Sequence, residues 1–536
     1  MKSSQQPEVD PRLVAAPTLA TRADGAAAGL VSGGLAVAIG MLSAGIIDVV
    51  SPIDAVGSTF IDHVPRWLKE WAIQQFGTND KLALRIGIFA VLAVAAAIIG
   101  VVARTRAWAG IVGIAAFGVI GAWAAVTRPG ESAAALVPSA LGALVGAVVL
   151  YRFLRPAMNG PRETPGPSPA PLGWDRRRFL VATGAAAVTA TAAGVAASAI
   201  ERRRIDDIEA AIPDSLPPVS VGNATGSAAG TASEAATLPE LRGVTSFVTS
   251  NDEFYRIDTA FSLPRVDPAT WSLRIDGMVD KPVSYTYADL QALPQVEHMV
   301  TLCCVSNEVG GEYIGNAVWQ GVSLRALLEE AGVQAGAEQL FSTSVDGWTC
   351  GFPVELALDG RDALIAIGMN GEALPLAHGF PARLVVPGVY GYVSATKWIE
   401  SIEITTWDAS TGYWVPRGWS RLGPIKTQSR IDVPRRGESL AAGPNKIAGV
   451  AWAQHRGIAG VEVRIDDGEW MAARLGEVTT DDSWCQWVVD WDATAGDHTV
   501  QVRATDKAGD TQTEAVAPVA PDGATGYHTR RISVNG

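Results

Sequence analysis

The residues of this chain best suited to chemistry are two adjacent cysteines, Cys303 and Cys304, in the stretch TLCCVSNEVGG. The 536 residues include only four cysteines, so no disulfide framework is predicted. A thiolate binds soft metals well, and one cysteine is enough where a larger cofactor supplies the remaining donor atoms. Taken alone, such a pair most often consists of small buried apolar side chains, and a disulfide between the neighbours is the second alternative. No C-x-x-C pair of a zinc site and no haem attachment motif is present.

Composition indicates that part of the chain lies in a membrane. Hydrophobic residues make up 48% of the sequence, and the length allows about three domains. The formal net charge of -13, without a basic run interleaved with aromatic residues, gives no surface for nucleic acid. We therefore expect a membrane protein with no nucleic-acid partner.

Five apolar segments follow one another in the first 200 residues. They span residues 26–50, 82–103, 107–127, 132–152 and 179–200. Each approaches the roughly 20 residues that cross a bilayer as a helix, and five in succession favour a membrane bundle over buried soluble helices. The prediction is a cytoplasmic tail over residues 1–25 and an all-α membrane bundle of five helices over residues 26–200.

Basic residues predict the orientation of this bundle. Three groups flank the helices on one side: Lys2, Arg12 and Arg22; Arg104 and Arg106; and Arg152, Arg155, Arg162 and Arg176 to Arg178. The positive-inside rule then places the N-terminus in the cytoplasm and everything after the fifth helix outside a bacterial cell membrane. The ERRR run, with Arg202 to Arg204, lies on the opposite flank and argues against this orientation.

The last apolar segment begins with DRRRFLVATGAAAVTATAAG, which resembles a twin-arginine export signal. An ordinary basic anchor before a helix is the alternative. Twin-arginine export moves folded proteins and so suits a domain that receives its cofactor before crossing. Residues 201–240 are rich in Pro, Ser, Ala, Gly and Thr without helical periodicity, which predicts a flexible linker.

The remaining chain divides into two globular regions. Residues 241–428 mix short β-prone runs such as WSLRIDGMV with a helical run, SLRALLEEAGV, and predict an α+β domain. It has no nucleotide-binding glycine motif. Residues 429–536 alternate between apolar and polar residues with turns at about ten-residue intervals, the pattern of an immunoglobulin-like β-sandwich. Such a sandwich is expected to serve packing or dimerisation.

Three ordered stretches carry a family resemblance: TLCCVSN, then AVWQGVSLRALLEEAGV, then GMNGEALPLAHGFPARLVVPGVYGYVSATKWIESIEI. They resemble the molybdenum cofactor domain of the sulfite oxidase family, and the sandwich resembles that family's dimerisation domain. The resemblance covers about residues 245–536 and leaves out the N-terminal helices. It implies a molybdenum-molybdopterin cofactor and two-electron oxygen-atom transfer with a small substrate.

The resemblance also assigns residues. In the motif formed by Leu302, Cys304 and Asn307, the second cysteine is the implied molybdenum ligand, with Cys303 packed beside it. The implied cofactor-binding residues are Arg256, Asn307, His378, Arg383, Gly391, Ser394 and Lys397. Arginine offers a bidentate fork to phosphate, lysine a point charge, and glycine lets backbone amides approach a ligand.

Departures from the family pattern bear on the substrate. The family carries Arg five residues after the ligand cysteine, where this chain has Val309 beside Glu308. The family's active-site Tyr is replaced by Trp419, and Arg417 is a nearby cation; both are candidate catalytic residues. A carboxylate opposes an anion pocket. These departures favour reduction of an S-oxide or N-oxide, with sulfite dehydrogenation as the alternative.

Two further expectations concern partners and thiols. The predicted helices contain no histidine pair for haem, so a separate cytochrome or a quinone-linked protein is expected to exchange electrons with the site. A non-catalytic membrane-anchored binding protein is the alternative of a different class. Cys350 and Cys485 are expected to be free and buried.

Overall fold

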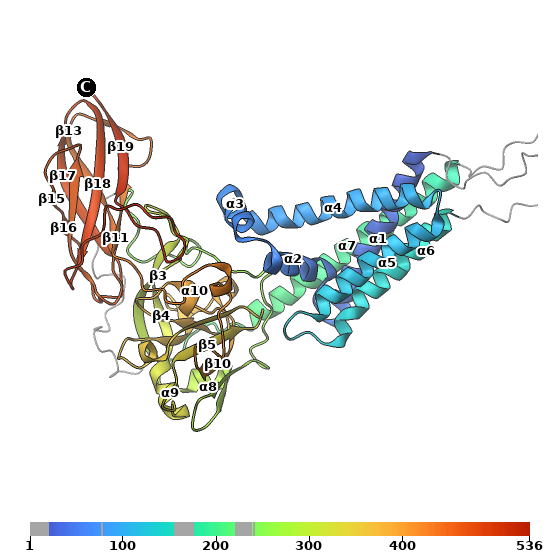
Figure 1. Cartoon of the computed structure of the whole chain (residues 1–536), viewed down its shortest axis with the longest axis horizontal. Helices are drawn as coiled ribbons and strands as arrows, with labels where there is room; N and C mark the ends of the chain where they lie inside the picture. Colours follow the sequence, from blue (N-terminus) through green and yellow to red (C-terminus); the bar gives the residue numbers. More distant parts are fainter. Residues whose placement is uncertain (1–20, 77–78, 155–175, 220–237, 239–241) are drawn as a thin grey trace, which may run out of the picture. The chain divides into compact units, whose positions relative to one another are not determined.

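The computed structural model describes residues 21–76, 79–154, 176–219, 238 and 242–536 (Figure 1). The chain forms two compact units, one reaching Asp206 with residues 259–262, the other comprising Asp207–Asp258 and Leu263–Gly536. Most of the predicted cytoplasmic tail, the Pro-rich segment before the arginines and the middle of the predicted linker lie outside the described residues.

Five long helices dominate the first unit, and each is long and apolar enough to cross a membrane. They are α1 (Arg22–Ile47), α4 (Asp80–Ala103), α5 (Ala107–Val126), α6 (Leu136–Leu154) and α7 (Arg176–Ala210). All five apolar segments are thus helical, as predicted. Helix α7 continues ten residues past the expected end at residue 200, so the first part of the predicted linker is helical rather than flexible.

Small residues let these helices approach one another closely. Where α1 crosses α4, a Cβ atom on Gly29 would collide with the carbonyl oxygen of Ala96, and one on Gly100 with the carbonyl oxygen of Gly25. Close backbone approach of this kind is how apolar helices associate where the surroundings provide no hydrophobic driving force.

Two shorter helices, α2 (Pro52–His63) and α3 (Arg66–Phe76), stand between α1 and α4 and escaped the sequence analysis. Their 12 and 11 residues are too few for a membrane span, so a search for long apolar runs passes over them. Helix α2 starts conventionally, with Ser51 as its N-cap and Pro52 in its first turn.

The first part of the second unit is called the cofactor region below, because it contains the residues that the family resemblance assigns to the cofactor. It contains two five-stranded sheets. The first has the order β2 (Val283–Thr286), β1 (Ser272–Gly277), β10 (Ile399–Thr405), β5 (Gln339–Ser344), β6 (Thr349–Pro353). The second contains β3 (Val296–Cys303), β4 (Ile314–Ser323), β7 (Leu364–Met369) and β8 (Glu372–Ala373), with β9 (Arg383–Val385) also pairing with β7.

Helices complete this region and confirm its mixed α and β character. They are α8 (Tyr287–Ala292), α9 (Leu324–Ala331) and the short α10 (Gly391–Ser394). The predicted apolar face of α9 is buried at Leu324, Leu327 and Leu328. The helix begins at the Ser323 cap and ends at Gly332, whose φ of 73° suits glycine.

Two more sheets pack on a shared core at the C-terminal end of the chain (Figure 1). One contains β11 (Gln428–Val433), β13 (Gly443–Trp452), β17 (Cys485–Ala493) and β16 (Arg474–Leu475). The other contains β12 (Ser439–Ala441), β19 (His528–Asn535), β18 (Gly496–Asp506), β14 (Ile458–Ile465) and β15 (Met471–Ala472). Alternate residues of β18, such as Val500 and Val502, face that core.

Candidate active site

The two cysteines fall on either side of a strand end. Cys303 is the last residue of β3 and is 2% exposed, whereas Cys304 is the first residue after the strand and is half-buried. The Cys304 backbone N–H donates to the Tyr313 carbonyl at 2.9 Å, and the Ser306 N–H points at the Cys304 Sγ at 3.4 Å. Both thiols are free, so the disulfide interpretation is wrong.

Burial raises the pKa of both thiols. The hydrogen bond from Ser306 opposes this rise at Cys304, whereas the neighbouring Cys304 adds to it at Cys303. A buried thiolate needs a nearby positive charge, which a bound metal ion supplies. Cys304, with its hydrogen-bond donor and its greater exposure, is therefore the better placed of the two to bind a metal.

The C-terminal sandwich holds the strand that ends at the cysteines. The Thr301 N–H donates to the Asp482 carbonyl at 2.9 Å, and the Thr301 hydroxyl accepts the Trp484 N–H at 2.7 Å. Gln454 donates to the Thr301 carbonyl at 2.9 Å. These bonds join residues more than 150 positions apart in the sequence, so local sequence patterns gave no sign of them.

The sandwich also fixes the loop after Cys304. Arg430 on β11 donates from Nη1 to the Gly311 carbonyl at 2.8 Å and pairs through Nε with Asp432 at 2.7 Å. Gly310, with φ of 78°, lies against the His528 ring, so a side chain there would need both an unfavourable backbone and occupied space. Contacts with Arg430 of β11 and with the His528 ring therefore fix the loop that follows Cys304.

A cluster of buried charges forms the second part of the site. Lys397 Nζ lies 2.6 Å and Arg256 Nε 2.9 Å from the same Asp258 oxygen, and Asp258 is only 5% exposed. The charge of Arg383 acts to lower the pKa of Lys397, and the charge of Lys397 acts to lower the pKa of Asp346. The structure thus brings together three of the predicted cofactor-binding cations, Arg256, Arg383 and Lys397.

Arg383 is held where its charge is poorly compensated. Its guanidinium lies 4.8 Å from the Trp319 ring centre, and Nη1 donates to the His378 carbonyl at 3.1 Å. Its Nε is buried and has no hydrogen-bond partner among the described residues. Burial lowers the pKa of Arg383 to about 10 and that of Lys397 to about 8, so both remain largely cationic at neutral pH.

This cluster suits the anionic group that the family's cofactor carries. Buried cations are costly unless an anion compensates them, and an arginine with an unused donor is well adapted to phosphate. The unpaired Arg383 Nε is the observation that supports this fit. The residues present therefore match a pterin phosphate on the side of Arg383 and a metal at Cys304.

His378 is neutral in this setting. Its Nε2 donates to the Asn251 carbonyl at 2.9 Å, and burial first of all lowers its pKa to about 4. The next residue, Gly379, has φ of 115°, and a Cβ there would lie 3.1 Å from both Arg383 Cβ and Lys397 Cβ. The turn after His378 therefore lets the two cationic segments pack against each other.

Tyr255 lies next to Arg256 and was missed by the sequence analysis. Burial raises the pKa of its phenol well above the usual value, and the Cys304 and Cys303 thiols raise it further, while Arg383 opposes them. Its ring stacks on that of Phe254 at 5.1 Å, centre to centre, and Phe254 lies 5.6 Å from the His378 ring. The segment NDEFYRID was considered only for Arg256, although a phenol next to that arginine was visible in it.

The other predicted cofactor residues have roles in shaping the site. Asn307 is 4% exposed and accepts the Tyr313 N–H at 2.8 Å, which closes the cysteine loop. A Cβ on Gly391 would lie 3.8 Å from the Cys303 carbonyl oxygen, so α10 starts beside the strand end. The buried Ser394 hydroxyl donates to the Tyr390 carbonyl at 3.0 Å and stabilises α10. Direct contact of these residues with a cofactor stays a prediction.

The two predicted catalytic residues take different positions. Arg417, in the 3-10 turn η6 (Val415–Arg417), lies over the Tyr413 ring, with 3.6 Å between Cζ and the ring centre. Trp419 is 6% exposed and lies 5.8 Å, centre to centre, from the Tyr392 ring in α10. Trp419 therefore packs beside α10, which starts next to the end of β3, whereas Arg417 packs on the ring of Tyr413.

Comparisons with known proteins show which families this chain is similar to. The family described as an oxidoreductase molybdopterin binding domain matches residues 260–414. The uncharacterized oxidoreductase YuiH of Bacillus subtilis is 34% identical over 157 residues, which are 29% of this chain and 76% of that protein. The mitochondrial sulfite oxidase of Homo sapiens is 29% identical over 330 residues, 52% of this chain and 60% of that protein.

A solved structure, the sulfane dehydrogenase SoxCD from Paracoccus pantotrophus, is 26% identical with a TM-score of 0.45, over 50% of this chain and 75% of that chain. The family model matches the part of the chain that contains Cys304, Arg383 and Lys397.

Proposed function

Because this chain belongs to the sulfite oxidase family of molybdopterin-dependent oxidoreductases, we propose that it is a membrane-anchored enzyme acting on a small substrate outside the cytoplasm. Its cofactor is molybdenum-molybdopterin, which when bound supplies two-electron oxygen-atom transfer. The alternative of a non-catalytic binding protein is set aside because its relatives are oxidoreductases.

The observation that carries this proposal is the buried cation cluster, in which Lys397 and Arg256 share Asp258 and the buried Arg383 Nε has no hydrogen-bond partner among the described residues. Cys304 would hold the metal through its thiolate. Arg383, Lys397 and Arg256 would hold the cofactor's phosphate, and Asp258 keeps two of these cations in place. Tyr255 would present its phenol O–H as a hydrogen-bond donor to a substrate oxygen, a role left open where Trp419 stands in place of the family's tyrosine.

Several features support a membrane location with the N-terminus in the cytoplasm. The contrary run at Arg202 to Arg204 is partly compensated, since Arg204 Nη1 lies 2.5 Å from Asp48 Oδ1. Trp67 and Trp71 on α3 are 67% and 49% exposed, which suits a helix lying in the interface. The RRxFL motif at the start of α7 would direct twin-arginine export of the folded second unit through a bacterial cell membrane.

The substrate proposal rests on charge. Val309 stands where the family has an arginine, Glu308 beside it is exposed, and Arg417 is engaged with Tyr413. An uncharged S-oxide or N-oxide suits this surface better than a dianion. For an S-oxide, the reaction takes two protons and two electrons and releases sulfide product and water. The second candidate, sulfite oxidation, takes up water and releases two electrons and two protons. It is supported by the similarity to relatives such as the human protein, which is named a sulfite oxidase.

Both directions need an electron partner, which we expect to be a cytochrome or a quinone-linked component. We also expect the C-terminal sheets to form an immunoglobulin-like sandwich that supports a homodimer. The bonds from Asp482, Trp484 and Gln454 to Thr301 indicate that this sandwich also positions the cysteine strand.

The test is a paired assay of purified full-length protein with measured molybdenum content. Reduction of S-oxides and N-oxides is followed with a reduced viologen dye, and oxidation of sulfite with ferricyanide. The proposal expects about one molybdenum per chain and faster turnover in the reductive assay. Specific turnover of sulfite alone would establish the second candidate, and folded protein without molybdenum would overturn both.

A further inference from the structure

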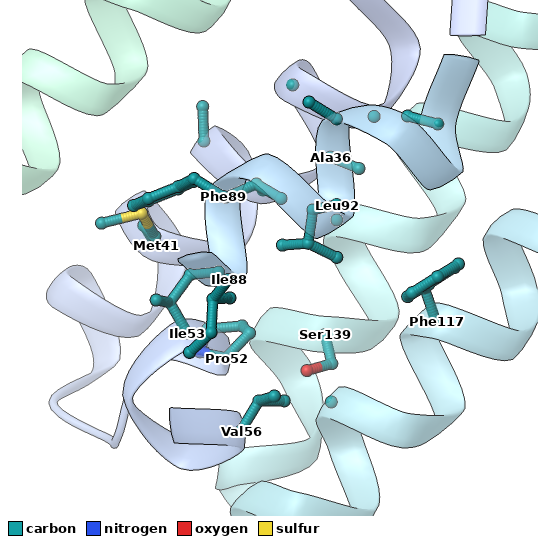
Figure 2. Close-up of a pocket in the computed structure, with 18 of the residues that line it drawn as sticks. Ala36, Met41, Pro52, Ile53, Val56, Ile88, Phe89, Leu92, Phe117 and Ser139 are labelled. Atoms are coloured by element: carbon teal, nitrogen blue, oxygen red, sulfur yellow. The ribbon is translucent and has the colours of Figure 1, made fainter. Parts of the chain in front are cut away.

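The helical unit contains an apolar pocket that anchoring alone does not require. It has a volume of about 1010 Å³ and is lined by parts of α1, α2, α4, α5, α6 and α7 (Figure 2). Helix α4 meets α1 closely at Gly29 and Gly100; Gly29 borders the pocket at this contact, and residues nearer the start of α4, such as Leu84 and Ile88, line the rest of it. A space of this size is typical of a site for a small molecule.

The lining is uncharged and nearly uniform in chemistry. Among the described residues that line the pocket, none is acidic or basic, and only Ser139 and Ser198 carry a polar side chain. Ser198 donates to the Gly194 carbonyl of its own helix at 3.0 Å. The pocket therefore excludes a charged ligand group from its interior and offers one distinctive position, Ser139.

Ser139 is 5% exposed, and its hydroxyl has no hydrogen-bond partner among the described residues. Figure 2 shows its Oγ directed toward Pro52 and Val56 across the pocket. Several hydroxyls in this unit bond to carbonyls of their own helix, as Ser43 does to the Ile39 carbonyl at 2.8 Å, whereas Ser32 and Thr183, outside the pocket lining, also lack a partner among the described residues. A buried, unused donor in an apolar pocket calls for an acceptor on a ligand.

We propose that this pocket binds a membrane quinone, with a ring carbonyl accepting a hydrogen bond from Ser139 and the isoprenoid tail lying along the apolar lining. A phospholipid acyl chain would fill the same space without giving the Ser139 hydroxyl a partner. An isoprenoid quinone combines an uncharged ring, carbonyl acceptors and an apolar tail, and so matches both parts of the lining.

The position of Ser139 along its helix fits a ring near one end of the bundle. Ser139 lies in the first turn of α6, beside Gly121 of α5 and near Pro52, the first residue of α2. The start of α6 lies at the same end of the bundle as the end of α1 and the start of α2. The Arg85–Asp54 and Arg128–Asp62 ion pairs lie at that end too. The tail would then run toward the close contact between α1 and α4.

This inference rests on the membrane location proposed above, and the experiment keeps the two separable. Full-length protein is reconstituted in phosphatidylcholine nanodiscs and labelled with an azido-ubiquinone, with short-chain ubiquinone as competitor. Mass spectrometry of the labelled peptides identifies the site. The expected result is saturable, competable labelling of peptides from α4 and α6.

Two matched pairs of variants sharpen the test. Ser139→Ala is expected to weaken competition by ubiquinone about 3- to 10-fold, the net worth of one hydrogen bond, while Ser32→Ala leaves it unchanged. Ser32 is also buried and without a partner among the described residues, but it does not line the pocket. Gly194→Leu is expected to abolish saturable labelling by filling the pocket, while Gly184→Leu on the same helix does not. Both glycines face open space, and only Gly194 lines the pocket.

Three outcomes overturn the inference. One is equal labelling in Gly194→Leu and Gly184→Leu, and another is labelling confined to lipid. The third is protein that leaves the membrane without detergent, which overturns the membrane location as well. Gly34→Leu provides a second pocket-filling variant if Gly194→Leu fails to fold, since Gly34 also lines the pocket and faces open space.

Discussion

The helical unit and the cofactor region bury polar groups in opposite ways. In the helices, small residues bring backbones together, and hydroxyls such as that of Ser43 bond within their own helix. In the cofactor region, buried charges at Lys397, Arg383 and Asp258 lie within one cluster. The helical unit is therefore organised by the shape of its packing surfaces, whereas the cofactor region gathers buried charges that an anionic ligand would compensate.

The largest expected effect tests the ligand side of this comparison. Replacing the thiolate in Cys304→Ser should lower turnover at least about 100-fold, because loss of a metal ligand exceeds the effect of losing its supporting residues. Cys303→Ser, the matched control at a neighbouring buried thiol, should retain most activity. Turnover and the molybdenum absorption spectrum are measured together, and equal loss in both variants would contradict the assignment of Cys304.

The charge cluster gives the next largest effect. Arg383→Met should reduce molybdenum and pterin content, because losing one partner of a buried charge interaction costs about 2–5 kcal/mol of binding free energy. Arg325→Met removes a surface arginine that pairs with Glu329 at 2.7 Å and serves as the control. Cofactor content per folded chain is the measurement. If Arg383→Met kept its full content even at limiting cofactor, the proposed phosphate contact would be wrong.

The stability of the helical unit should instead depend on side-chain volume at the close helix contacts. Gly29→Leu is expected to destabilise the bundle by about 3 kcal/mol, since the new side chain meets the Ala96 carbonyl. Gly34→Leu on the same helix faces open space and should be tolerated. Thermal unfolding of each variant in nanodiscs distinguishes them. Similar melting temperatures would show that the close crossing of α1 and α4 carries little of the stability.

The smallest effect concerns acid stability in the second unit, Asp207–Asp258 with Leu263–Gly536. Burial first, then Arg530 and Arg430, lowers the pKa of His528 to about 4, and Asp432 opposes them. Because the unfolded pKa is about 6.5, the unfolded state binds the proton more readily, so stability is present above pH 6.5 and lost as pH falls toward 4. Between pH 7 and pH 5 this amounts to about 2 kcal/mol.

His528→Asn should remove that acid dependence. The asparagine keeps an acceptor for the Ile431 N–H, which donates to His528 Nδ1 at 2.8 Å, but it does not titrate. His63→Asn, at an accessible histidine of α2, is the control. Melting temperatures at pH 7 and pH 5 provide the measurement. An unchanged difference between the two pH values in His528→Asn would rule out His528 as the source.

Part of the candidate site was predicted because the family resemblance rests on local motifs. Through Leu302, Cys304 and Asn307 the resemblance implied the metal ligand, and through His378 and Arg383 the phosphate side; both assignments stay predictions. Lys397 was placed with them, and the structure gathers it with Arg383. Tyr255 was missed because a lone aromatic residue next to an arginine carries no distinctive spacing.

The amino-acid sequence alone was enough to predict the five long helices, the mixed α and β region and the strands of the sandwich, because apolar length and periodicity report what each segment can bury. It left undecided that Arg430 holds the Gly311 carbonyl and that Asp482 and Trp484 fix Thr301. The pocket around Ser139 could not be predicted from the sequence either, since helix periodicity does not show where two helices separate. These features depend on groups that are distant in the chain and meet only when the tertiary structure brings their backbones into hydrogen-bonding or van der Waals distance.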